Sequence, residues 1–304
     1  MSALPEIPSS RALGDTGLSI SSIGWGMWRL VEAGLSSSEI DALVNAVLDT
    51  GITLFDTADI YGFNGADGFG DAEILLGTAL SANRALRSRM VLATKGGIRP
   101  PLPYDQSASY LADAIDASLK RLKTDVIDLW QVHRPDILTH PQELARALEN
   151  AVTAGKIRAL GVSNFTMPQI DALQHFLGQK LVSTQPEISA LRLDCFENGE
   201  MDQAMMQGLC VLAWSPLGGG RIAKPVSPRE QAVAVALDSF TQEQGISRTT
   251  AALSWLMAHP AGIVPIVGSQ NPGRIAEAAE AANVRWTRQA WYAVYVAARG
   301  VPLP

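Results

Sequence analysis

The stretch LFDTADIYG at residues 54–62 places Asp56 five positions before Tyr61. An apolar pair followed by Asp-Thr and a small residue is typical of an aspartic-protease strand. A second Asp-Thr, at Asp15 in LGDTGL, would supply the partner carboxylate for a dyad that shares one proton. Asp56 would otherwise be a buried structural carboxylate, or one part of a site that also uses Tyr61. The elements that carry these residues decide among the three interpretations.

A repeating pattern of helices and strands surrounds these residues. SSSE at 36–39 predicts a capping box, and the apolar residues after it fall at helical spacing until Gly51. The next residues, ITLFD, form a short apolar run bounded by turn signals, which predicts a buried strand that ends at Asp56. The same alternation continues along the chain and predicts eight strands, at 21–26, 52–56, 90–95, 126–133, 156–164, 181–189, 208–216 and 262–269.

This alternation predicts an α/β fold, either an open doubly wound sheet or a closed (β/α)8 barrel. A dinucleotide-binding sheet would need G-x-G-x-x-G opening a helix directly after its first strand. Here Gly24 and Gly26 are followed by Met27, Trp28 and Arg29, well before the next predicted helix. The pattern therefore favours a (β/α)8 TIM barrel. No linker, low-complexity run or charge block divides the chain, which predicts a single domain over residues 1–304.

The carboxyl ends of barrel strands meet at one rim, where enzymes of this fold place their chemistry. Polar residues end seven successive predicted strands, and Tyr61 follows the first of them on its loop. Because such a set is hard to obtain by chance, the sequence predicts one functional site at this rim. The seven residues are Asp56, Lys95, His133, Asn164, Gln185, Ser215 and Ser269.

The composition argues against several function classes. A net charge of −6 is unlike that of proteins that bind nucleic acids or anionic membranes. Two cysteines, Cys195 and Cys210, in no paired spacing fit a reducing compartment and exclude a zinc site built from cysteines. The first residues lack a basic segment followed by an apolar run, and no stretch approaches the roughly 18 apolar residues of a membrane span. We therefore expect a cytoplasmic protein without a metal site.

Several stretches together resemble one enzyme family. FDTADIYG, LATKGG, SLKRLKTDVIDLWQVH, GKIRALGVSNF and WSPLGGG resemble the aldo-keto reductases, and RALGDTGLSISSIGWG resembles their N-terminal hairpin and first strand. The resemblance implies a hairpin that closes the bottom of the barrel and a catalytic tetrad of Asp56, Tyr61, Lys95 and His133. It also implies a nicotinamide cofactor, usually NADPH, bound without a Rossmann fold.

The four residue types suit the reduction of a carbonyl group, which needs a hydride on carbon and a proton on oxygen. A tyrosine, with an ordinary pKa of about 10, is a poor acid at neutral pH unless its anion is stabilised, and the ammonium group of Lys95 would lower that pKa. Asp56 would hold Lys95 and offset the cost of burying its charge. His133 would hydrogen-bond the substrate carbonyl, orient it or share in proton transfer. We therefore expect Tyr61 to donate the proton.

The resemblance also implies contacts to the nicotinamide half of the cofactor. Ser163, Asn164 and Gln185 match the residues that contact the carboxamide, for which hydroxyl and amide groups are suitable partners. Trp214 stands where the family usually has a tyrosine or phenylalanine that stacks on the nicotinamide ring. The glycine-rich segment that follows would let backbone N–H groups approach the pyrophosphate.

The segment VGSQNPGRIAEA resembles the part of the family that binds the adenosine 2′-phosphate. Arg274 is suited to a phosphate, which favours NADPH and leaves NADH possible. Two departures weaken this preference: Gly268 replaces a lysine found in many members, and Ala278 replaces a common asparagine. The expected cofactor contacts are Gly26, Met27, Trp28, Asp56, Ser163, Asn164, Gln185, Trp214, Ser215, Leu217, Gly219, Arg221, Gly268, Ser269, Arg274 and Glu277.

The substrate pocket is the least determined part of the site. The residues expected to contact a small carbonyl substrate are Trp28, Tyr61, His133, Arg134 and Trp214, with Ile60 beside them. These side chains suggest an apolar or aromatic carbonyl compound, and the short tail suggests an open pocket. Arg134 would attract an anionic group or pair with Asp136. The sequence gives no indication of the oligomeric state.

Two other functions fit a barrel. Lys95 at a strand end could form a Schiff base, as in barrel aldolases. The chain could also be a nicotinamide-binding redox sensor or regulatory subunit with slow turnover. The acid dyad, in contrast, does not fit an alternating fold, because Asp15 and Asp56 should lie at opposite ends of the barrel.

Overall fold

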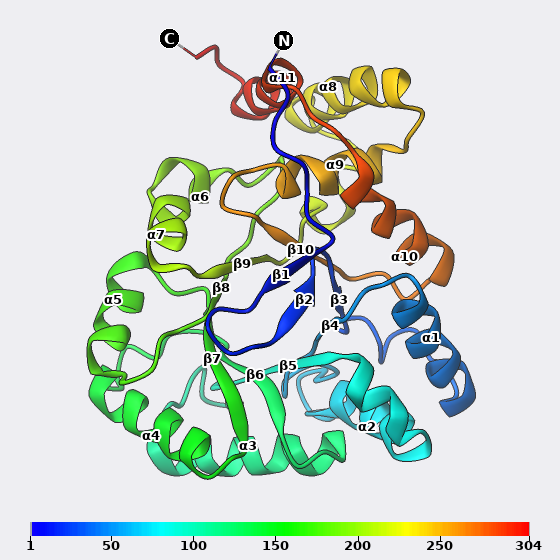
Figure 1. Ribbon diagram of the computed structural model, residues 1–304. Coiled ribbons are helices and arrows are strands. Elements are labelled where there is room, and N and C mark those ends of the chain that lie inside the picture. The colour runs from blue at the N-terminus through cyan, green and yellow to red at the C-terminus, as the bar shows by residue number, and fades with distance from the viewer. Residues whose placement is uncertain (1, 304) are drawn as a thin grey trace.

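The computed structural model describes residues 2–303, apart from the side chain of residue 243 (Figure 1). Eight parallel strands close into a barrel in the order β10-β3-β4-β5-β6-β7-β8-β9, and helices surround it. This is the predicted (β/α)8 barrel. The strands are β3 (Gly24–Gly26), β4 (Leu54–Asp56), β5 (Val91–Gly96), β6 (Ile127–Val132), β7 (Ile157–Ser163), β8 (Ser183–Gln185), β9 (Cys210–Ala213) and β10 (Val264–Val267).

Several helices begin where the sequence supplies a cap or a proline. Ser36 and Glu39 form the predicted capping box of α1, and Pro168 lies in the first turn of α5, where its missing N–H costs little. Figure 1 shows α8 and α11 packed together at one side of the ring. The helices are α1 (Ser37–Asp49), α2 (Asp71–Ala82), α3 (Ala108–Leu122), α4 (Pro141–Thr153), α5 (Met167–Phe176), α6 (Asp194–Glu197), α7 (Glu200–Gln207), α8 (Pro228–Gln244), α9 (Arg248–Met257), α10 (Pro272–Ala279) and α11 (Arg288–Arg299), with 3₁₀ turns η1 (Arg84–Arg89), η2 (Gly218–Gly220) and η3 (Glu280–Asn283).

The sixth barrel strand is shorter than predicted. We expected a strand over 181–189, whereas β8 ends at Gln185. Pro186 follows, and a proline has no N–H to donate to a sheet ladder. The chain then continues beside β9 with a single bridge between Glu187 and Trp214. Gln185 consequently ends its strand at the rim, as predicted.

A hairpin of β1 (Ser10–Ala12) and β2 (Ser19–Ser21) covers the amino-terminal end of the barrel. Residue 21, expected in the first barrel strand, belongs to this hairpin instead. Leu13 and Ile20 are fully buried against inward-facing barrel residues, so the hairpin closes the bottom as expected. Asp15 is exposed in the hairpin turn, whereas Asp56 ends β4 at the other end of the barrel. This separation excludes the acid dyad.

The barrel interior changes from apolar to polar toward its open end. Successive side chains of a strand point to opposite faces, so alternate residues of each barrel strand point inward. On β4 and β5 the inward residues Leu54 and Ala93 belong to the apolar cluster that the hairpin covers. The next inward residues are Asp56 and Lys95, both buried. The fold therefore places two charged side chains inside the barrel just below the mouth.

Candidate active site

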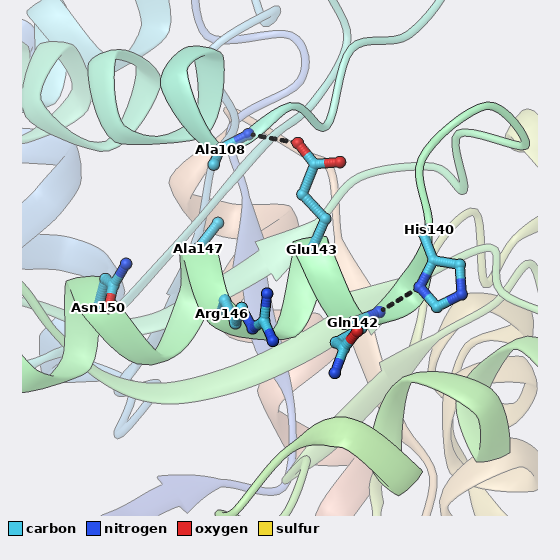
Figure 2. Close-up of a pocket in the computed structure, with 7 residues that line it drawn as sticks. All are labelled: Ala108, His140, Gln142, Glu143, Arg146, Ala147 and Asn150. Carbon is cyan, nitrogen blue, oxygen red and sulfur yellow. Dashed lines mark hydrogen bonds between the residues drawn. The ribbon is translucent and has the colours of Figure 1, made fainter.

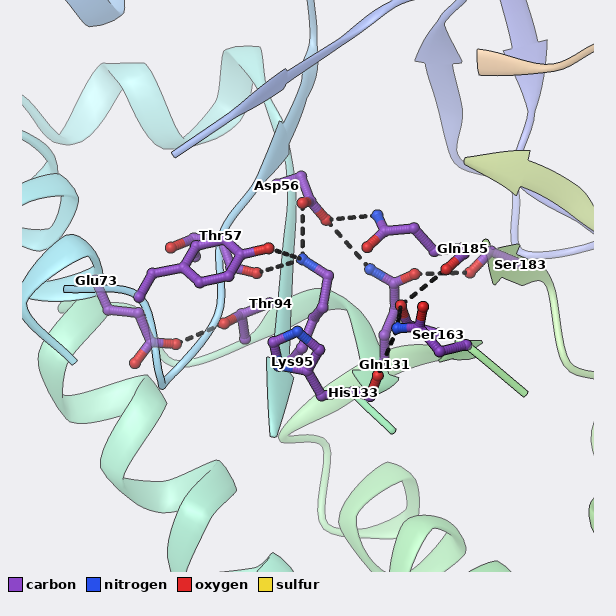
Figure 3. Close-up of polar contacts among 12 residues, drawn as sticks. Asp56, Thr57, Glu73, Thr94, Lys95, Gln131, His133, Ser163, Ser183 and Gln185 are labelled. Carbon is purple, nitrogen blue, oxygen red and sulfur yellow. Dashed lines mark hydrogen bonds and ion pairs between the residues drawn. The ribbon is translucent and has the colours of Figure 1, made fainter. Parts of the chain in front are cut away.

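Lys95 is the centre of a buried hydrogen-bond network at the mouth (Figure 3). Its ammonium nitrogen Nζ donates to Asp56 Oδ2 at 2.7 Å, to the Thr57 carbonyl oxygen at 2.9 Å and to Tyr61 Oη at 3.2 Å. The Asp56–Lys95 pair is almost completely removed from solvent. The structure thus brings three of the four tetrad residues predicted from the sequence into direct contact.

Neighbouring strands and one turn create this contact. β4 and β5 are paired in parallel, with Asp56 opposite Ala93, so Lys95 reaches back toward Asp56 from one layer above. After β4 the chain turns, and the Tyr61 N–H donates to the Ala58 carbonyl oxygen at 3.1 Å. The phenol is thereby directed back over the strand ends.

Gln131 belongs to the network and was not predicted. Its Nε2 donates to Asp56 Oδ1 at 3.3 Å, and Gln185 Nε2 donates to the same oxygen at 3.0 Å. Gln131 is fully buried on β6, two residues before His133. A polar residue two positions after the inward-facing Leu129 was the available signal, but the prediction considered only the strand ends.

Burial and charge determine the protonation states of the tyrosine and the lysine. Burial raises the pKa of Tyr61 above its usual value, and Lys95 opposes this shift without reversing it. We had expected Lys95 to lower that pKa overall, and the difference arises because burial and Asp56 both disfavour the phenolate. Burial alone would lower the pKa of Lys95, but the charges of Asp56 and Tyr61 raise it above its usual value. The network therefore holds a protonated phenol beside an ammonium group.

His133 lies beside the phenol in its neutral form. The Tyr61 and His133 rings meet edge to face at 5.9 Å, and the backbone N–H of His133 donates to the Gly96 carbonyl oxygen at 2.9 Å. Burial, together with the charges of Lys95 and Arg134, holds the pKa of His133 well below its usual range. A neutral imidazole donates from one ring nitrogen and accepts at the other, which suits it to orient a carbonyl oxygen.

Two further predicted residues flank the phenol. The indole of Trp28 is 56% exposed and meets the Tyr61 ring edge to face at 5.1 Å. The guanidinium of Arg134 makes no ion pair with a carboxylate of residues 2–242 or 244–303. Asp136, its suggested partner, instead accepts hydrogen bonds from the backbone of Gln106 and the hydroxyl of Thr139. The cation of Arg134 is therefore available at the mouth.

The residues predicted to contact a carboxamide lie together. Ser163 Oγ donates to the Gln185 carbonyl oxygen at 2.8 Å, and Asn164 Nδ2 donates to Ser163 Oγ at 2.9 Å. Trp214 Nε1 donates to Asn164 Oδ1 at 3.0 Å. Asn164 has a φ of +60°, an uncommon backbone conformation for a residue other than glycine. This set offers both donors and acceptors, which fits an amide group of a nicotinamide.

The loop after β9 has accessible backbone that fits a diphosphate. Ser215 has a φ of +53°, and its Oγ accepts a hydrogen bond from the Gly219 N–H at 2.9 Å. Gly219 and Gly220 are exposed, and a Cβ added at either would meet no atom within 4 Å. Leu217 is half-buried beneath the loop, while Arg221 Nε donates to the Gly218 carbonyl oxygen at 2.8 Å.

The segment after β10 lies beside the first barrel strand. Trp25 Nε1 donates to the Ser269 carbonyl oxygen, and Gln270 Nε2 donates to the Gly26 carbonyl oxygen, both at 3.0 Å. Asn271 caps α10, whose exposed outer face carries Arg274 and Glu277. Gly268 is also exposed. An arginine in the first turn of a helix suits a phosphate group.

Met27 differs from the other expected cofactor residues because its side chain is completely buried in the core. Its backbone N–H donates to the Asp56 backbone carbonyl oxygen, and its carbonyl oxygen accepts from the Leu30 N–H. The neighbouring Trp28 is the exposed residue of this segment.

A surface depression elsewhere on the barrel contains none of the predicted site residues. Figure 2 shows it between the start of α3 and the outer face of α4, where Glu143 Oε1 accepts a hydrogen bond from the Ala108 N–H. Its lining residues are Ala108, His140, Gln142, Glu143, Arg146, Ala147 and Asn150. Within residues 2–303, no three His, Cys, Asp or Glu side chains are grouped so as to hold a metal ion. Over the same range no helix has the length and apolar character needed to cross a membrane.

Comparison with known proteins gives one consistent result. Residues 22–295 match the Aldo/keto reductase family. The chain is 68% identical over 304 residues, all of both chains, to a 6-dehydroglucose reductase of Novosphingobium aromaticivorans. It is 38% identical over 293 residues to a 6-dehydroglucose reductase of Agrobacterium fabrum, covering 93% of this chain and 96% of the relative. A thermostable aldo-keto reductase crystallised with the inhibitor epalrestat superposes with a TM-score of 0.80 at 23% identity, covering 95% of this chain and 99% of that one.

Proposed function

Because the chain belongs to the aldo/keto reductase family, an oxidoreductase family that acts on carbonyl groups, we propose that it reduces an aldehyde or ketone to an alcohol with NADPH. Tyr61 is the general acid, and Lys95, Asp56 and His133 assist it. The observation that carries this proposal is the 3.2 Å hydrogen bond from Lys95 Nζ to Tyr61 Oη, with Asp56 behind the lysine.

The proposed chemistry requires one hydride and one proton. A nicotinamide cofactor held at the mouth would supply the hydride for the carbonyl carbon. Tyr61 donates its hydroxyl proton to the carbonyl oxygen, and the ammonium group of Lys95 stabilises the phenolate that remains. Asp56 keeps that ammonium group in place, while neutral His133 hydrogen-bonds the carbonyl oxygen. Solvent then returns a proton to Tyr61.

The proposed cofactor site follows the mouth from the amide cluster to α10. Ser163, Asn164 and Gln185 bind the carboxamide, and the half-buried indole of Trp214 covers the nicotinamide ring. The exposed glycines after β9 receive the diphosphate. Arg274 in the first turn of α10 favours NADPH over NADH, because a guanidinium pairs well with the additional phosphate.

For the substrate we propose a sugar aldehyde, with 6-dehydroglucose as the first candidate. Two relatives that align over at least 93% of this chain carry that compound in their names. The half-buried Arg134 is suited to hydrogen-bond sugar hydroxyl groups, and the exposed indole of Trp28 is suited to the apolar face of a sugar ring. This proposal replaces the apolar or aromatic substrate expected from the sequence.

The test is reduction by the purified protein of 6-dehydroglucose, a simple aliphatic aldehyde and an aromatic aldehyde, each with NADPH and with NADH. We expect NADPH oxidation with the highest kcat/KM for the sugar aldehyde and one alcohol formed per NADPH consumed. If no aldehyde is reduced while NADPH binds tightly, the redox-sensor function is favoured instead. A covalent adduct at Lys95 after borohydride treatment with substrate would favour the aldolase.

Three broader expectations accompany this proposal. Residues 1–304 form one barrel domain, and the protein works in the cytoplasm. Its substrate is a small molecule rather than a nucleic acid or a membrane. Size-exclusion chromatography, limited proteolysis and fractionation of cells test these points directly.

A further inference from the structure

A second polar cluster lies on the outer face of β5. We call it the outer cluster and define it by Asp59, Glu73, Thr94 and Arg121. Thr94 lies next to Lys95 in β5, and since successive side chains point to opposite faces of a strand, Thr94 points outward where Lys95 points into the barrel. Figure 3 shows Thr94 and Glu73 joined beside the catalytic network.

Three members of the outer cluster are buried, and the Arg121 side chain is 18% exposed. Glu73 and Thr94 are fully buried. Thr94 Oγ1 donates to Glu73 Oε1, and Arg121 Nε donates to Glu73 Oε2, both at 2.6 Å. Because Glu73 belongs to α2 and Arg121 to α3, one carboxylate ties two helices to the strand that carries Lys95.

The backbone of Asp59 is hydrogen-bonded to the backbone of Lys95. Its N–H donates to the Lys95 carbonyl oxygen at 3.0 Å. Its carboxyl group lies against Gly96, where an added Cβ would come within 3.0 Å of Asp59 Oδ2 and 2.5 Å of the Trp130 ring. The absence of a side chain at Gly96 therefore lets two groups pack closely on the strand directly after Lys95.

The first turn of α2, which contains Glu73, is also hydrogen-bonded to the backbone of Tyr61, the proposed acid. The N–H of Ala72, the residue before Glu73, donates to the Tyr61 carbonyl oxygen at 3.2 Å. The backbone of Tyr61 and the strand of Lys95 are thus both attached to the first turn of α2. The separation of their reacting groups depends on the position of this turn.

We propose that the outer cluster positions the Lys95 ammonium group against the Tyr61 hydroxyl group, with Thr94, Glu73 and Arg121 as positioning residues. The inference rests on the catalytic roles proposed above for Lys95 and Tyr61. A misplacement of about 1 Å at a reacting group can lower a rate about 10²-fold. A clamp on the outer face of β5 limits such movement without contacting substrate or cofactor.

The test compares Thr94→Val, which removes the hydroxyl at nearly constant volume, with Thr94→Ser, which keeps it. Thr184→Val is the matched control, because Thr184 is a buried threonine next to Gln185 on another barrel strand. We expect Thr94→Val to lower kcat for sugar-aldehyde reduction about tenfold, equivalent to a barrier increase of about 1.4 kcal/mol. The KM for NADPH should stay within about twofold of that of the original enzyme, because Thr94 does not contact the cofactor. Thr94→Ser should retain most of kcat, because serine keeps the hydroxyl group that donates to Glu73.

The pH profile provides a readout that a purely structural role would not change. If Lys95 moves away from Tyr61, the phenolate loses stabilisation and the basic limb of kcat against pH shifts upward in Thr94→Val. The limb should stay in place in Thr94→Ser and Thr184→Val. An equal loss of kcat in Thr94→Val and Thr184→Val, or no loss in either, would overturn the inference.

Arg121→Lys keeps the test decisive if Thr94→Val does not fold, because a lysine preserves the charge opposite Glu73 but not the guanidinium geometry. It should lower kcat with the KM for NADPH unchanged, and an unchanged kcat in this variant would also overturn the inference. Failure of the proposed function is distinguishable, because the unmodified protein and Thr184→Val would then reduce no carbonyl compound at all.

Discussion

Lys95 donates a hydrogen bond of 3.2 Å to the hydroxyl oxygen of Tyr61, while burial raises the pKa of that phenol above its usual value. In the proposed reaction the two effects serve different stages of the proton transfer. Burial would keep the proton on Tyr61 before the reaction, and the adjacent ammonium group would stabilise the phenolate as the proton leaves. Burying the charged Lys95 without Asp56 would be costly. Asp56 therefore allows the ammonium group to remain charged beside Tyr61.

Replacing Tyr61 by phenylalanine should abolish most reduction of the sugar aldehyde. We expect kcat to fall about 10²- to 10⁴-fold, the usual contribution of a general acid, with NADPH affinity nearly unchanged because the ring remains. Stopped-flow turnover and a fluorescence titration with NADPH measure the two quantities. Tyr292→Phe, at an exposed tyrosine of α11, is the control and should keep full activity. Comparable turnover in both variants would rule out Tyr61 as the acid.

Asp56→Asn should destabilise the fold as well as reduce activity. The substitution leaves the Lys95 ammonium group buried without its carboxylate, and breaking a buried pair in this way typically costs about 3–5 kcal/mol. Equilibrium unfolding in urea at pH 7 measures the loss. Asp49→Asn removes the partner of Arg89 in an exposed ion pair and should cost less than about 1 kcal/mol. Equal losses for the two variants would contradict the importance of the buried pair.

His133 should stay neutral throughout the range in which the enzyme works. Its pKa is held well below the usual range by burial and by the charges of Lys95 and Arg134. We expect its imidazole resonance to show no titration step between about pH 6 and pH 8, the range around the ordinary histidine pKa. The spectrum of His133→Gln identifies the resonance. A titration midpoint at or above about 6.5 would show that the imidazole is charged at the site.

Arg274→Ala should reduce the preference for NADPH. Loss of a charge-assisted contact worth about 1.5–3 kcal/mol should raise the KM for NADPH about 10- to 100-fold and leave the KM for NADH nearly unchanged. Steady-state kinetics with both cofactors give the ratio. Arg288→Ala, at the exposed first turn of α11, should leave both constants unchanged. Parallel changes for the two cofactors would place the 2′-phosphate elsewhere.

Asp59→Asn should stabilise the protein increasingly as the pH rises. Burial and the charge of Glu73 hold the pKa of Asp59 well above its usual value, against the opposing charges of Arg121 and Lys95. Folding therefore takes up a proton above about pH 4, and the stability from this group is lost as the pH rises toward the folded pKa.

Asparagine resembles the neutral acid and avoids this loss. The advantage of the variant in urea unfolding should grow from pH 5 to pH 7 by up to about 1.4 kcal/mol per pH unit. Asp15→Asn, at the exposed hairpin turn, provides the baseline. A pH-independent difference between Asp59→Asn and the original protein would show that Asp59 is ionised in the folded state.

The fold was predictable because it depends on local periodicity. Apolar runs such as ITLFD, a capping box at Ser36 and the alternation of strands with helices are visible in any short window of the chain. Periodicity does not determine where each strand ends. β8 is shorter than predicted because Pro186 interrupts its ladder of hydrogen bonds. Strand ends also indicated the rim residues, since a barrel brings all its carboxyl ends to one face.

The sequence by itself determined the barrel, the rim and the residue types available there. Tertiary structure decided which of these touch: Lys95 bonds both Asp56 and Tyr61, Gln131 joins them, and Asp136 bonds the Gln106 backbone rather than Arg134. It also decided the direction of the pKa shift at Tyr61. Burial raises this pKa by more than the charge of Lys95 lowers it. The reason is physical. Periodicity acts between neighbours along the chain, whereas desolvation and hydrogen-bond distance depend on groups that only folding brings together.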